Sequence, residues 1–471
     1  MYSDKLFVNS FFERSSEMGK SSASLPIVRH GHSTYRRTLW VFEEKTMSKI
    51  KLIIILSIYF FINSCQSQDK GITKSERVEI FEQVWENVNQ HFYDPNFNRI
   101  DWGEKHFEYK TKIENCNNTD SLFHLLNKML FELNSSHCGV GLLSDLDKAV
   151  SPYIFSNGEI GIDIRIIENQ ILVTKVLKNS AAENANIKVG YIIEKIDGLT
   201  INEIEKLVKL KPPFNYRNRN FHLTSEVLRH IYGDANTNVK IDFIDENNQS
   251  HFKVLTRTER QNGISLGGGL PPAFLTSESY FISENTAYLS FNAFNPADLG
   301  HVLSNLEKVN TSKGLIIDLR GNDGGSIDGM KLLLGRFISE RKKYGTYINR
   351  NERNEDFIEP IGTKYQGKIV VLIDEMSISG AENMAGIIQL FNIGKVIGKQ
   401  TPGQILWGNG YLINDSIALA IPIYKLEYPN GFNPENNGIT PDIEVELQQE
   451  DLLKGKDTQL EKAIEYLNEK I

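Results

Sequence analysis

Hydrophobic positions along the chain follow three successive spacings. Beyond Ser75, and again beyond Thr119, they recur every three or four residues, which predicts two amphipathic helices that pack together. Residues 156–260 instead show short runs in which apolar and polar positions alternate, as in half-buried strands. From about Gln261 to Glu446, apolar strands alternate with helical stretches, the order expected of a sheet covered by helices. The pattern therefore predicts an α+β multidomain protein.

Turn residues and apolar runs set the expected bounds of these elements. The third region is expected to contain the strands Thr286–Phe291, Gly314–Leu319, Lys368–Ile373 and Ile417–Ile421 and helices over 296–309, 326–340 and 380–391. The second region is expected to contain the strands Ile160–Ile164, Ile171–Val176, Val239–Phe243 and Phe252–Leu255. The pair Asp197-Gly198 suits the positive φ angles of a tight hairpin turn. An inserted stretch rich in Pro, Asn and Arg precedes Val239.

Composition narrows the class of protein. The 471 residues leave room for two to four domains, and 40% hydrophobic with 24% charged residues is typical of a soluble globular protein. A net charge of −8 argues against nucleic acid as the main partner. The sequence contains neither Cys-x-x-Cys nor His-Glu-x-x-His, so we expect no metal site.

Residues 47–65 have the pattern of an export signal. A basic start at Met47 is followed by an apolar run from Leu52 to Ile62 that is too short for a comfortable membrane span. Because the ending Ile-Asn-Ser-Cys65 resembles a bacterial lipobox, we expect a signal peptide over 47–64 and a lipid on Cys65. A plain signal peptide or short anchor with an incidental Cys is the competing interpretation.

These expectations place the mature chain outside the cytoplasm. It would be a periplasmic or outer-membrane lipoprotein of a Gram-negative-type bacterium, with residues 65–74 as a tether. Residues 1–46 would lie upstream of the true initiator, Met47, and are left out of the fold. In an oxidising compartment Cys116 and Cys138 could pair, and two free thiols are equally consistent with the sequence.

Two segments of the third region carry candidate chemistry. Ser379 stands between the apolar strand ending at Ile373 and a helix starting near Gly380, where backbone N–H groups and the helix dipole favour an anion. Ser377 or Ser379 could instead be an ordinary N-cap. The glycine-rich run 320–325 follows another apolar strand, and such a turn could supply a second oxyanion donor, although most such turns are simply turns.

Three ordered motifs resemble those of the C-terminal-processing, or tail-specific, serine peptidases, and the resemblance spans residues 74–447. They are the Asp-Leu-Arg-x-Asn-x-Gly-Gly turn (318–325), the Ser-x-Ser-x-x-Glu loop (377–382) and the Gly-Ile-x-Pro-Asp-Ile terminus (438–443). The resemblance implies that Ser379 is the nucleophile and that the N–H groups of Gly324 and Gly380 form the oxyanion hole. It further implies peptides or unfolded C-terminal tails as substrates, and no cofactor.

The resemblance also implies how the chain is divided. An N-terminal helical domain is expected over 75–150 and a β-rich PDZ-like domain over 155–260. The α/β peptidase core, resembling ClpP and crotonase, is expected over 261–447, and a C-terminal helix over 448–471.

The base departs from the better-known branch of the family. Those enzymes use a Ser-Lys dyad, but Gln404 stands at the position of that Lys, and nothing in the sequence brings Lys399 to Ser379. A second branch, resembling the tricorn core protease, uses Ser, His, a Ser adjacent to the His, and Glu. Ser136-His137 and Glu435 stand where that branch has these residues. His137, with an ordinary pKa of about 6.5, would then be the base, and Ser136 and Glu435 would orient it.

The PDZ-like region has two possible roles. It could capture an extended peptide or a chain end by strand addition, with Gly158, Ile160, Gly161 and Ile162 forming the cradle for the terminal carboxylate. It could also serve only in packing. One departure from the bacterial PDZ pattern is Tyr191, which stands where Asp is usual. The rival to a peptidase is therefore a catalytically inactive relative that binds peptides through this region.

Overall fold

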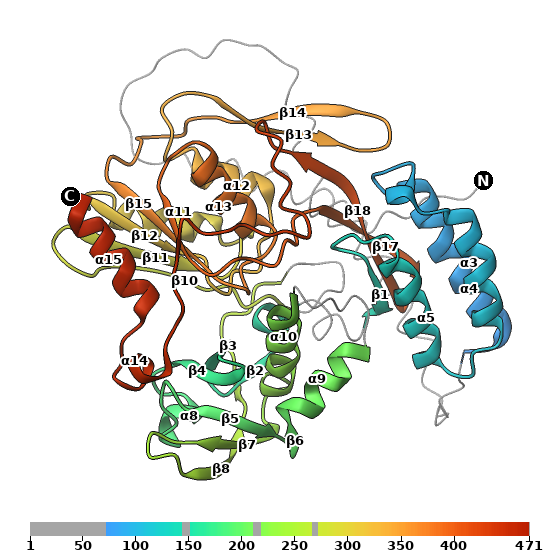
Figure 1. The fold of residues 1–471 in the computed structure, drawn as a ribbon, viewed down its shortest axis with the longest axis horizontal. Helices are drawn as coiled ribbons and strands as arrows, with labels where there is room; N and C mark the ends of the chain where they lie inside the picture. Colours follow the sequence, from blue (N-terminus) through green and yellow to red (C-terminus); the bar gives the residue numbers. More distant parts are fainter. Residues whose placement is uncertain (1–71, 144–150, 211–217, 266–271, 471) are drawn as a thin grey trace, which may run out of the picture. The chain divides into compact units, whose positions relative to one another are not determined.

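A computed structural model describes residues 72–143, 151–210, 218–265 and 272–470, which form one compact unit from Lys74 onward (Figure 1). The expected signal peptide and Cys65 lie outside the described residues. Within the described ranges, no helix has the length and apolarity needed to cross a bilayer.

The part of the chain after residue 260, expected to be the peptidase core and called the peptidase region below, is built on a six-stranded sheet. Its strands, in spatial order, are β10 (Ser277–Phe281), β11 (Thr286–Phe291), β12 (Gly314–Asp318), β15 (Lys368–Ile373), β16 (Lys395–Gly398) and β19 (Ile443–Glu444). All neighbours pair in parallel except β10 and β11. Parallel strands need crossovers, which here contain α11 (Leu299–Lys308), α12 (Ile327–Leu334) and α13 (Gly380–Leu390). Both β11 and β15 have the bounds that the sequence predicts.

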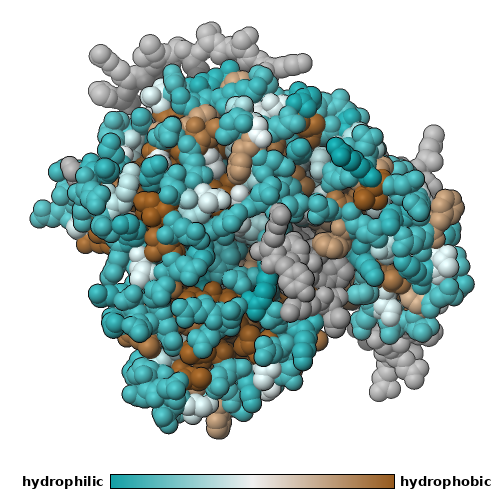
Figure 2. Space-filling model, in the orientation of Figure 1, coloured by the Kyte–Doolittle hydropathy of each residue, from teal (hydrophilic) through white to brown (hydrophobic). Residues whose placement is uncertain are grey.

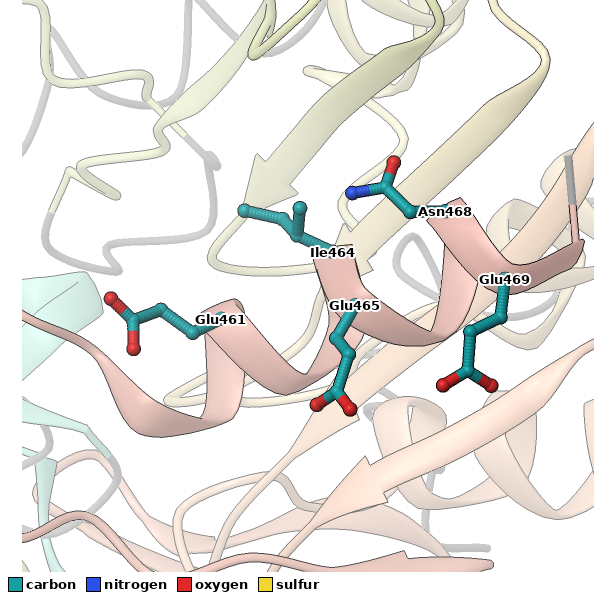
Figure 3. A pocket seen from close by; sticks show the side chains of 5 residues that line it. All are labelled: Glu461, Ile464, Glu465, Asn468 and Glu469. Atoms are coloured by element: carbon teal, nitrogen blue, oxygen red, sulfur yellow. The ribbon is translucent and has the colours of Figure 1, made fainter.

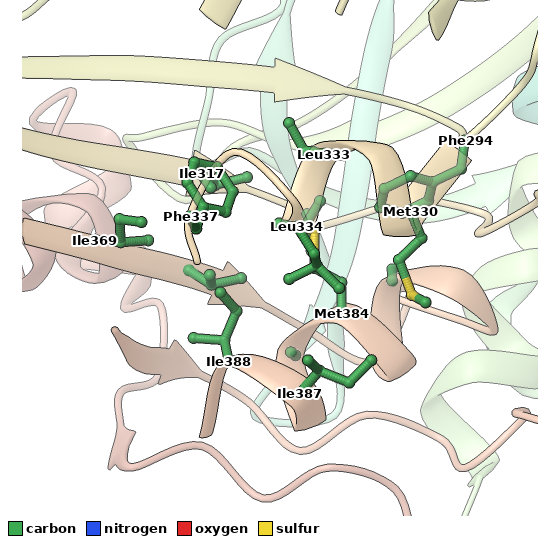
Figure 4. Close-up of a cluster of buried hydrophobic side chains, with 14 of the residues drawn as sticks. Phe294, Ile317, Met330, Leu333, Leu334, Phe337, Ile369, Met384, Ile387 and Ile388 are labelled. Atoms are coloured by element: carbon green, nitrogen blue, oxygen red, sulfur yellow. The ribbon is translucent and has the colours of Figure 1, made fainter. Parts of the chain in front are cut away.

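Alternating side chains of this sheet face two different layers. On one side Ile317 and Ile369 pack against α12 and α13, where Leu333 and Met384 are fully buried (Figure 4). On the other side Ile316, Val370 and Leu372 pack against Ala463 and Leu467 of α15 (Thr458–Lys470). The sequence predicts a single helix over 448–471, but the structure contains two, because Gly455 at φ 75° follows α14 (Gln449–Leu453).

A second sheet pairs a strand from the N-terminal part of the described chain with one from its C-terminal part. Its strands follow the order β1 (Gly139–Leu142), β18 (Ile417–Glu427), β13 (Lys342–Ile348) and β14 (Arg353–Ile358), and β17 (Trp407–Asn414) also pairs with β18. Strand β1 runs antiparallel to β18 from Gly139 opposite Ala420. The sequence predicts that residues 75–150 form a helical domain, whereas β1 is part of a sheet shared with the peptidase region.

Helices precede β1 and hold it in place. They are α3 (Lys74–His91), α4 (Trp102–Glu114) and α5 (Thr119–Phe131). The sequence predicts α3 and α5 but not α4, which begins at the N-cap Asp101. The Asn127 side chain of α5 receives the N–H of Val140 and donates to its carbonyl, at 3.0 and 2.8 Å. These bonds fix the loop that carries residues 132–138.

Residues 152–259 form a β-rich insert unit. Its sheet has the order β3 (Ile162–Ile167), β4 (Gln170–Val176), β5 (Ile192–Ile196), β7 (Asn238–Ile244) and β8 (Ser250–Thr256), all antiparallel. Asp197 and Gly198 form the tight turn after β5 with φ of 49° and 86°, as predicted. The inserted stretch before β7 contains α9 (Ile201–Leu210) and α10 (Arg219–Ile231), whose apolar side chains complete the core of the unit.

Candidate active site

The loop after β15 holds the two candidate nucleophiles in different environments. Ser377 is fully buried, and its Oγ donates to the carbonyl of Leu319 at 2.7 Å and accepts the N–H of Asp374 at 3.0 Å. Ser379 is partly exposed and occupies the N-cap position of α13, with φ 55° and ψ −111°. A positive φ is costly for a serine and is found where surrounding contacts fix the backbone. Ser377 is therefore a structural residue, and Ser379 has the accessible, constrained hydroxyl.

The glycine-rich turn lies against this serine. A Cβ on Gly324 would lie 2.6 Å from both the Cβ of Ser379 and the N of Gly380, so only glycine fits there. The Gly324 N–H donates to Oδ1 of Asn322 at 2.8 Å. The Gly380 N–H is the first amide of α13, which has no acceptor within its own helix. The structure thus brings together Ser379, Gly324 and Gly380, while oxyanion binding by the two glycines stays a prediction.

A hydrogen-bonded chain orients His137. The Ser136 N–H donates to Oε1 of Glu435 at 2.7 Å, and the Ser136 hydroxyl donates to Oε2 at 3.0 Å. The same hydroxyl oxygen lies 2.9 Å from Nδ1 of His137. Because the hydroxyl has a single proton, which goes to Glu435, Nδ1 must carry the proton of the ring. The lone pair of His137 is therefore on Nε2, as a general base requires.

Burial sets the charge state of this chain. It lowers the pKa of His137 to about 4, which keeps the imidazole neutral at pH 7. Burial raises the pKa of Glu435 to about 6, while hydrogen bonds from the N–H groups of Ser136 and Ile405 act in the opposite direction. At neutral pH the ring is thus neutral beside a carboxylate, and a proton taken up during reaction would be stabilised by that charge.

An arginine of the insert unit bonds to the loop after β15, whose Met376 also packs in the core of that unit. Arg165 of β3 is buried, and its Nε donates to Oδ2 of Asp374 at 2.5 Å. The other oxygen of Asp374 accepts the N–H groups of Gly321 and Met376 at 3.1 and 2.9 Å. One carboxylate thus connects the insert unit, the glycine-rich turn and the nucleophile loop. Sequence reasoning did not find Arg165, because nothing near it in the chain indicates a partner 209 residues away.

Comparison with known proteins places this site in a family. Residues 285–445 match the model of peptidase family S41, and residues 73–131 match that of the tricorn protease C1 domain. The chain therefore contains a peptidase S41 domain and a tricorn C1 domain. The S41 match covers the strands of the core sheet from β11 onward, with Gly324 and Ser379, and the C1 match covers the helices that precede His137.

Two curated relatives align with most of this chain. The tricorn protease of Thermoplasma acidophilum is 21% identical over 84% of this chain, and this chain spans 35% of its length. The carboxyl-terminal-processing protease of Synechocystis sp. is 24% identical over 83% of this chain and 87% of its own. The chain thus spans about a third of one relative and most of the other.

Solved structures agree with the fold. The photosystem II D1 C-terminal processing protease aligns with a TM-score of 0.52 at 18% identity, over 83% of this chain and 97% of its own. Mature CPAF aligns with a TM-score of 0.56 at 12% identity, over 84% and 96%. At these identities the likeness concerns the fold alone, a mixed helix and sheet arrangement shared with S41 proteases.

Lys399, which the sequence does not bring to Ser379, is ion-paired to two glutamates. Lys399 forms ion pairs with Glu446 and Glu444 after β16. Gln404 stands at the position of the family Lys, and its backbone N–H donates to Oε2 of Glu382 at 2.7 Å. The ion pairs of Lys399 agree with a mechanism that does not use this lysine.

The expected peptide cradle is covered in this structure. Gly158, Ile160, Gly161 and Ile162 are all buried, and a Cβ on Gly161 would lie 2.2 Å from the Cβ of Ser180. The carbonyl of Ile160 accepts the N–H of Ala182 at 3.0 Å. Binding of a chain end by these four residues stays a prediction.

Three further features bear on the thiols, a surface hollow and metal binding. Cys116 and Cys138 are free thiols, which decides between the two states that the sequence leaves open. A hollow along α15 is lined by Glu461, Glu465 and Glu469 with Ile464 and Asn468 (Figure 3). It shares no residue with the tetrad, the name used here for the four candidate residues Ser136, His137, Ser379 and Glu435. Among the described residues, no group of three His, Cys, Asp or Glu side chains is arranged to bind a metal.

The pH profile tests the assignment of His137. Catalysis needs a neutral Nε2, so kcat/KM should fall as pH falls through the pKa of His137, near 4 rather than the ordinary value of about 6.5. A smaller loss should come first, near pH 6, where Glu435 is protonated. His137→Ala should lose at least about 100-fold in kcat/KM, whereas Lys399→Ala should keep the wild-type profile. Loss of activity in Lys399→Ala alone would contradict the assignment.

Substitution of Gly324 tests the close approach of the turn. Gly324→Ala places a methyl group against Ser379 and Gly380, so kcat should fall by roughly 100- to 1,000-fold with the circular dichroism spectrum retained. Gly431→Ala is the matched control, because Gly431 has nearly the same φ, 76° against 74°, and an added Cβ there meets no described atom within 4 Å. Equal losses in the two variants would mean that backbone strain, rather than proximity to Ser379, is responsible.

Proposed function

We propose that the protein is an exported serine endopeptidase that cleaves peptides or unfolded C-terminal tails through an acyl-enzyme on Ser379. The observation that supports this most is the chain Glu435–Ser136–His137, which leaves Nε2 of the imidazole as an acceptor. Such a chain orients a histidine as a base and stabilises it when charged.

The proposed mechanism assigns one task to each residue. His137 Nε2 accepts the Ser379 hydroxyl proton while Oγ attacks the scissile carbonyl carbon, and the oxyanion binds amides at Gly324 and Gly380. His137 then returns the proton to the leaving amine, and the acyl group stays on Ser379. His137 next takes a proton from a water molecule, whose oxygen attacks the acyl carbon. The bond from that carbon to Oγ breaks, the product acid leaves, and His137 returns the proton to Oγ of Ser379. Ser136 and Glu435 stabilise the imidazolium without taking its proton.

Oxyanion binding requires one rearrangement. The Gly324 N–H is engaged by Asn322, so its donation to substrate requires the exchange of one acceptor for another. The exchange replaces a hydrogen bond to a neutral amide oxygen with one to a developing negative charge, which is the stronger bond.

The insert unit is proposed to be PDZ-like and to present substrate to the core, which we propose resembles ClpP and crotonase. Strand β3 is at the end of its sheet, the position at which an extended peptide can add as a further strand. Figure 2 shows apolar surface gathered over the insert unit. The relative from Synechocystis sp. is named for carboxyl-terminal processing, which supports chain ends as the substrate class.

A catalytically inactive peptide-binding relative is the rival function. The replacement of the family Lys by Gln404 favours it. Placement of Ser136 between His137 and Glu435 favours catalysis, because a chain without a base would have no need of that geometry.

Export and lipidation form a separate part of the proposal. The pattern over 47–65 supports a signal peptide followed by lipid attachment to Cys65. The mature protein would then be held at a membrane on the periplasmic side or at the outer membrane.

The two serines of the loop give the sharpest test of catalysis. Ser379→Ala should abolish peptide hydrolysis and covalent labelling by a fluorophosphonate probe while leaving the fold intact. Ser377→Ala should still be labelled, but it should lose about 1–3 kcal/mol of unfolding free energy, because it leaves buried partners unsatisfied. Labelling that survives Ser379→Ala and disappears in Ser377→Ala would shift the nucleophile by two residues. A wild-type protein that is never labelled would favour the binding function.

The N-terminus tests the anchor. Mature protein from the native host should begin at Cys65, carry lipid detectable by mass spectrometry and partition into the detergent phase. Cys65→Ala should leave unlipidated protein in the aqueous phase or as an uncleaved precursor, and Cys116→Ala should behave as wild type. An unlipidated mature N-terminus elsewhere would remove the anchor.

A further inference from the structure

The proposed nucleophile and base come from different parts of the chain. One buried carboxylate contacts both the nucleophile and the loop that lies next to the residues orienting the base. Glu382 is the third residue of α13 and is fully buried. One oxygen, Oε2, accepts the N–H of Ser379 at 3.1 Å and the N–H of Gln404 at 2.7 Å. The other, Oε1, accepts the Thr401 hydroxyl at 2.5 Å and the Gly403 N–H at 2.7 Å.

These four donors fill the carboxylate. Each oxygen accepts two hydrogen bonds, and a carboxylate in a buried site keeps its charge only with such compensation. Burial raises the pKa of Glu382 to about 7, and the four donors oppose that shift. An amide in place of the carboxylate could accept at only one of the two oxygen positions, and its NH₂ group would face two donors.

The donors on the far side belong to the loop that orients the base. Immediately after Gln404, the Ile405 N–H donates to Oε2 of Glu435 at 3.2 Å, and the Leu406 N–H lies 3.4 Å from the Ser136 hydroxyl oxygen. The loop 401–406 is thus bound first by Glu382 and then by the tetrad. A shift of this loop would move Glu435 and Ser136 relative to Ser379.

The nucleophile is bound on its other side as well. The carbonyl of Ser379 accepts the N–H of Asn383 at 2.9 Å and its Nδ2 at 3.1 Å. Asn383 is in turn fixed by the hydroxyl of Tyr428 at 2.6 Å. Glu382 is therefore the group that fixes the N–H side of the strained Ser379 peptide, and it is also the link to the base.

We infer that Glu382 is a positioning residue, which sets the distance and orientation between Ser379 and His137 by binding the nucleophile and the loop 401–406 with one carboxylate. This inference rests on the proposed function. Glu382 touches neither substrate nor the transferred proton, so its effect is on geometry alone. Misplacement of catalytic groups by about 1 Å can lower turnover about 100-fold.

The test separates geometry from folding. Active sites of the full-length protein are titrated with a fluorophosphonate, and kcat is expressed per titrated site. Glu382→Gln should lower kcat per site by about 100-fold and change KM by less than about threefold. Thr401→Val, which removes one of the four donors and nearly keeps the side-chain shape, should lower kcat per site by roughly three- to tenfold. Gln400→Ala, in the same loop but bonded to the carbonyl of Asn437, is the control and should match wild type.

Each outcome either supports or overturns the positioning role of Glu382. Wild-type kcat per site in Glu382→Gln, or a loss explained wholly by fewer titratable sites, would overturn the inference. If Glu382→Gln does not fold, Thr401→Val decides: an unchanged kcat per site overturns the inference, and a reduced one supports it. Failure of the proposed function has a different signature, because hydrolysis by wild type and Ser379→Ala would then be equal.

Discussion

The active site depends on a buried carboxylate that joins segments 299 residues apart. Glu435 receives two hydrogen bonds from Ser136 and one from Ile405, and it is nearly inaccessible to water. A carboxylate left without these donors would be costly to bury. The three donors therefore constrain where the N-terminal loop can lie. His137 is carried with Ser136, because the two are adjacent in sequence.

The sheets provide the frame for this constraint. Strand β1 begins two residues after His137 and pairs with β18, so the loop leaves the tetrad directly into a paired strand. Because Glu435 follows β18 by eight residues, both ends of the contact start from the same sheet. On the other side, β12 and β15 are adjacent parallel strands, and their carboxyl ends place the glycine-rich turn beside Ser379. One sheet thus positions Ser136, His137 and Glu435, and the other positions Ser379 and the glycine-rich turn.

Much of this frame could be predicted from the sequence. The apolar runs of β11, β12 and β15 are long and bounded by polar residues, which makes parallel, doubly buried strands recognisable. Helix α10 was missed, because Thr224, Ser225 and Glu226 interrupt its apolar pattern although all three are buried. Residues buried on several sides do not follow the amphipathic period on which helix prediction depends.

The candidate site, like the fold, could be predicted from the sequence only in part. Ser379, Ser136, His137 and Glu435 were assigned by their motifs, and the hydrogen bonds that join the last three depend on tertiary contacts. Arg165 and Asp374 were missed because their pairing joins the insert unit to the peptidase region, and no local spacing records it. Likewise, only the folded structure shows that Asn322 accepts the Gly324 N–H. Contacts between distant segments are the part that periodicity cannot supply.

The proposed use of histidine in place of lysine as the base changes which segments the fold must hold together. A lysine at position 404 would belong to the same loop that Glu382 binds, so nucleophile and base would both come from the peptidase region. In the proposed mechanism the base, His137, comes from the segment before β1, so catalysis would need the N-terminal helices and the β1–β18 pairing. The requirement for tertiary structure is larger, but no lysine pKa need be lowered by several units, because burial leaves an imidazole neutral at pH 7.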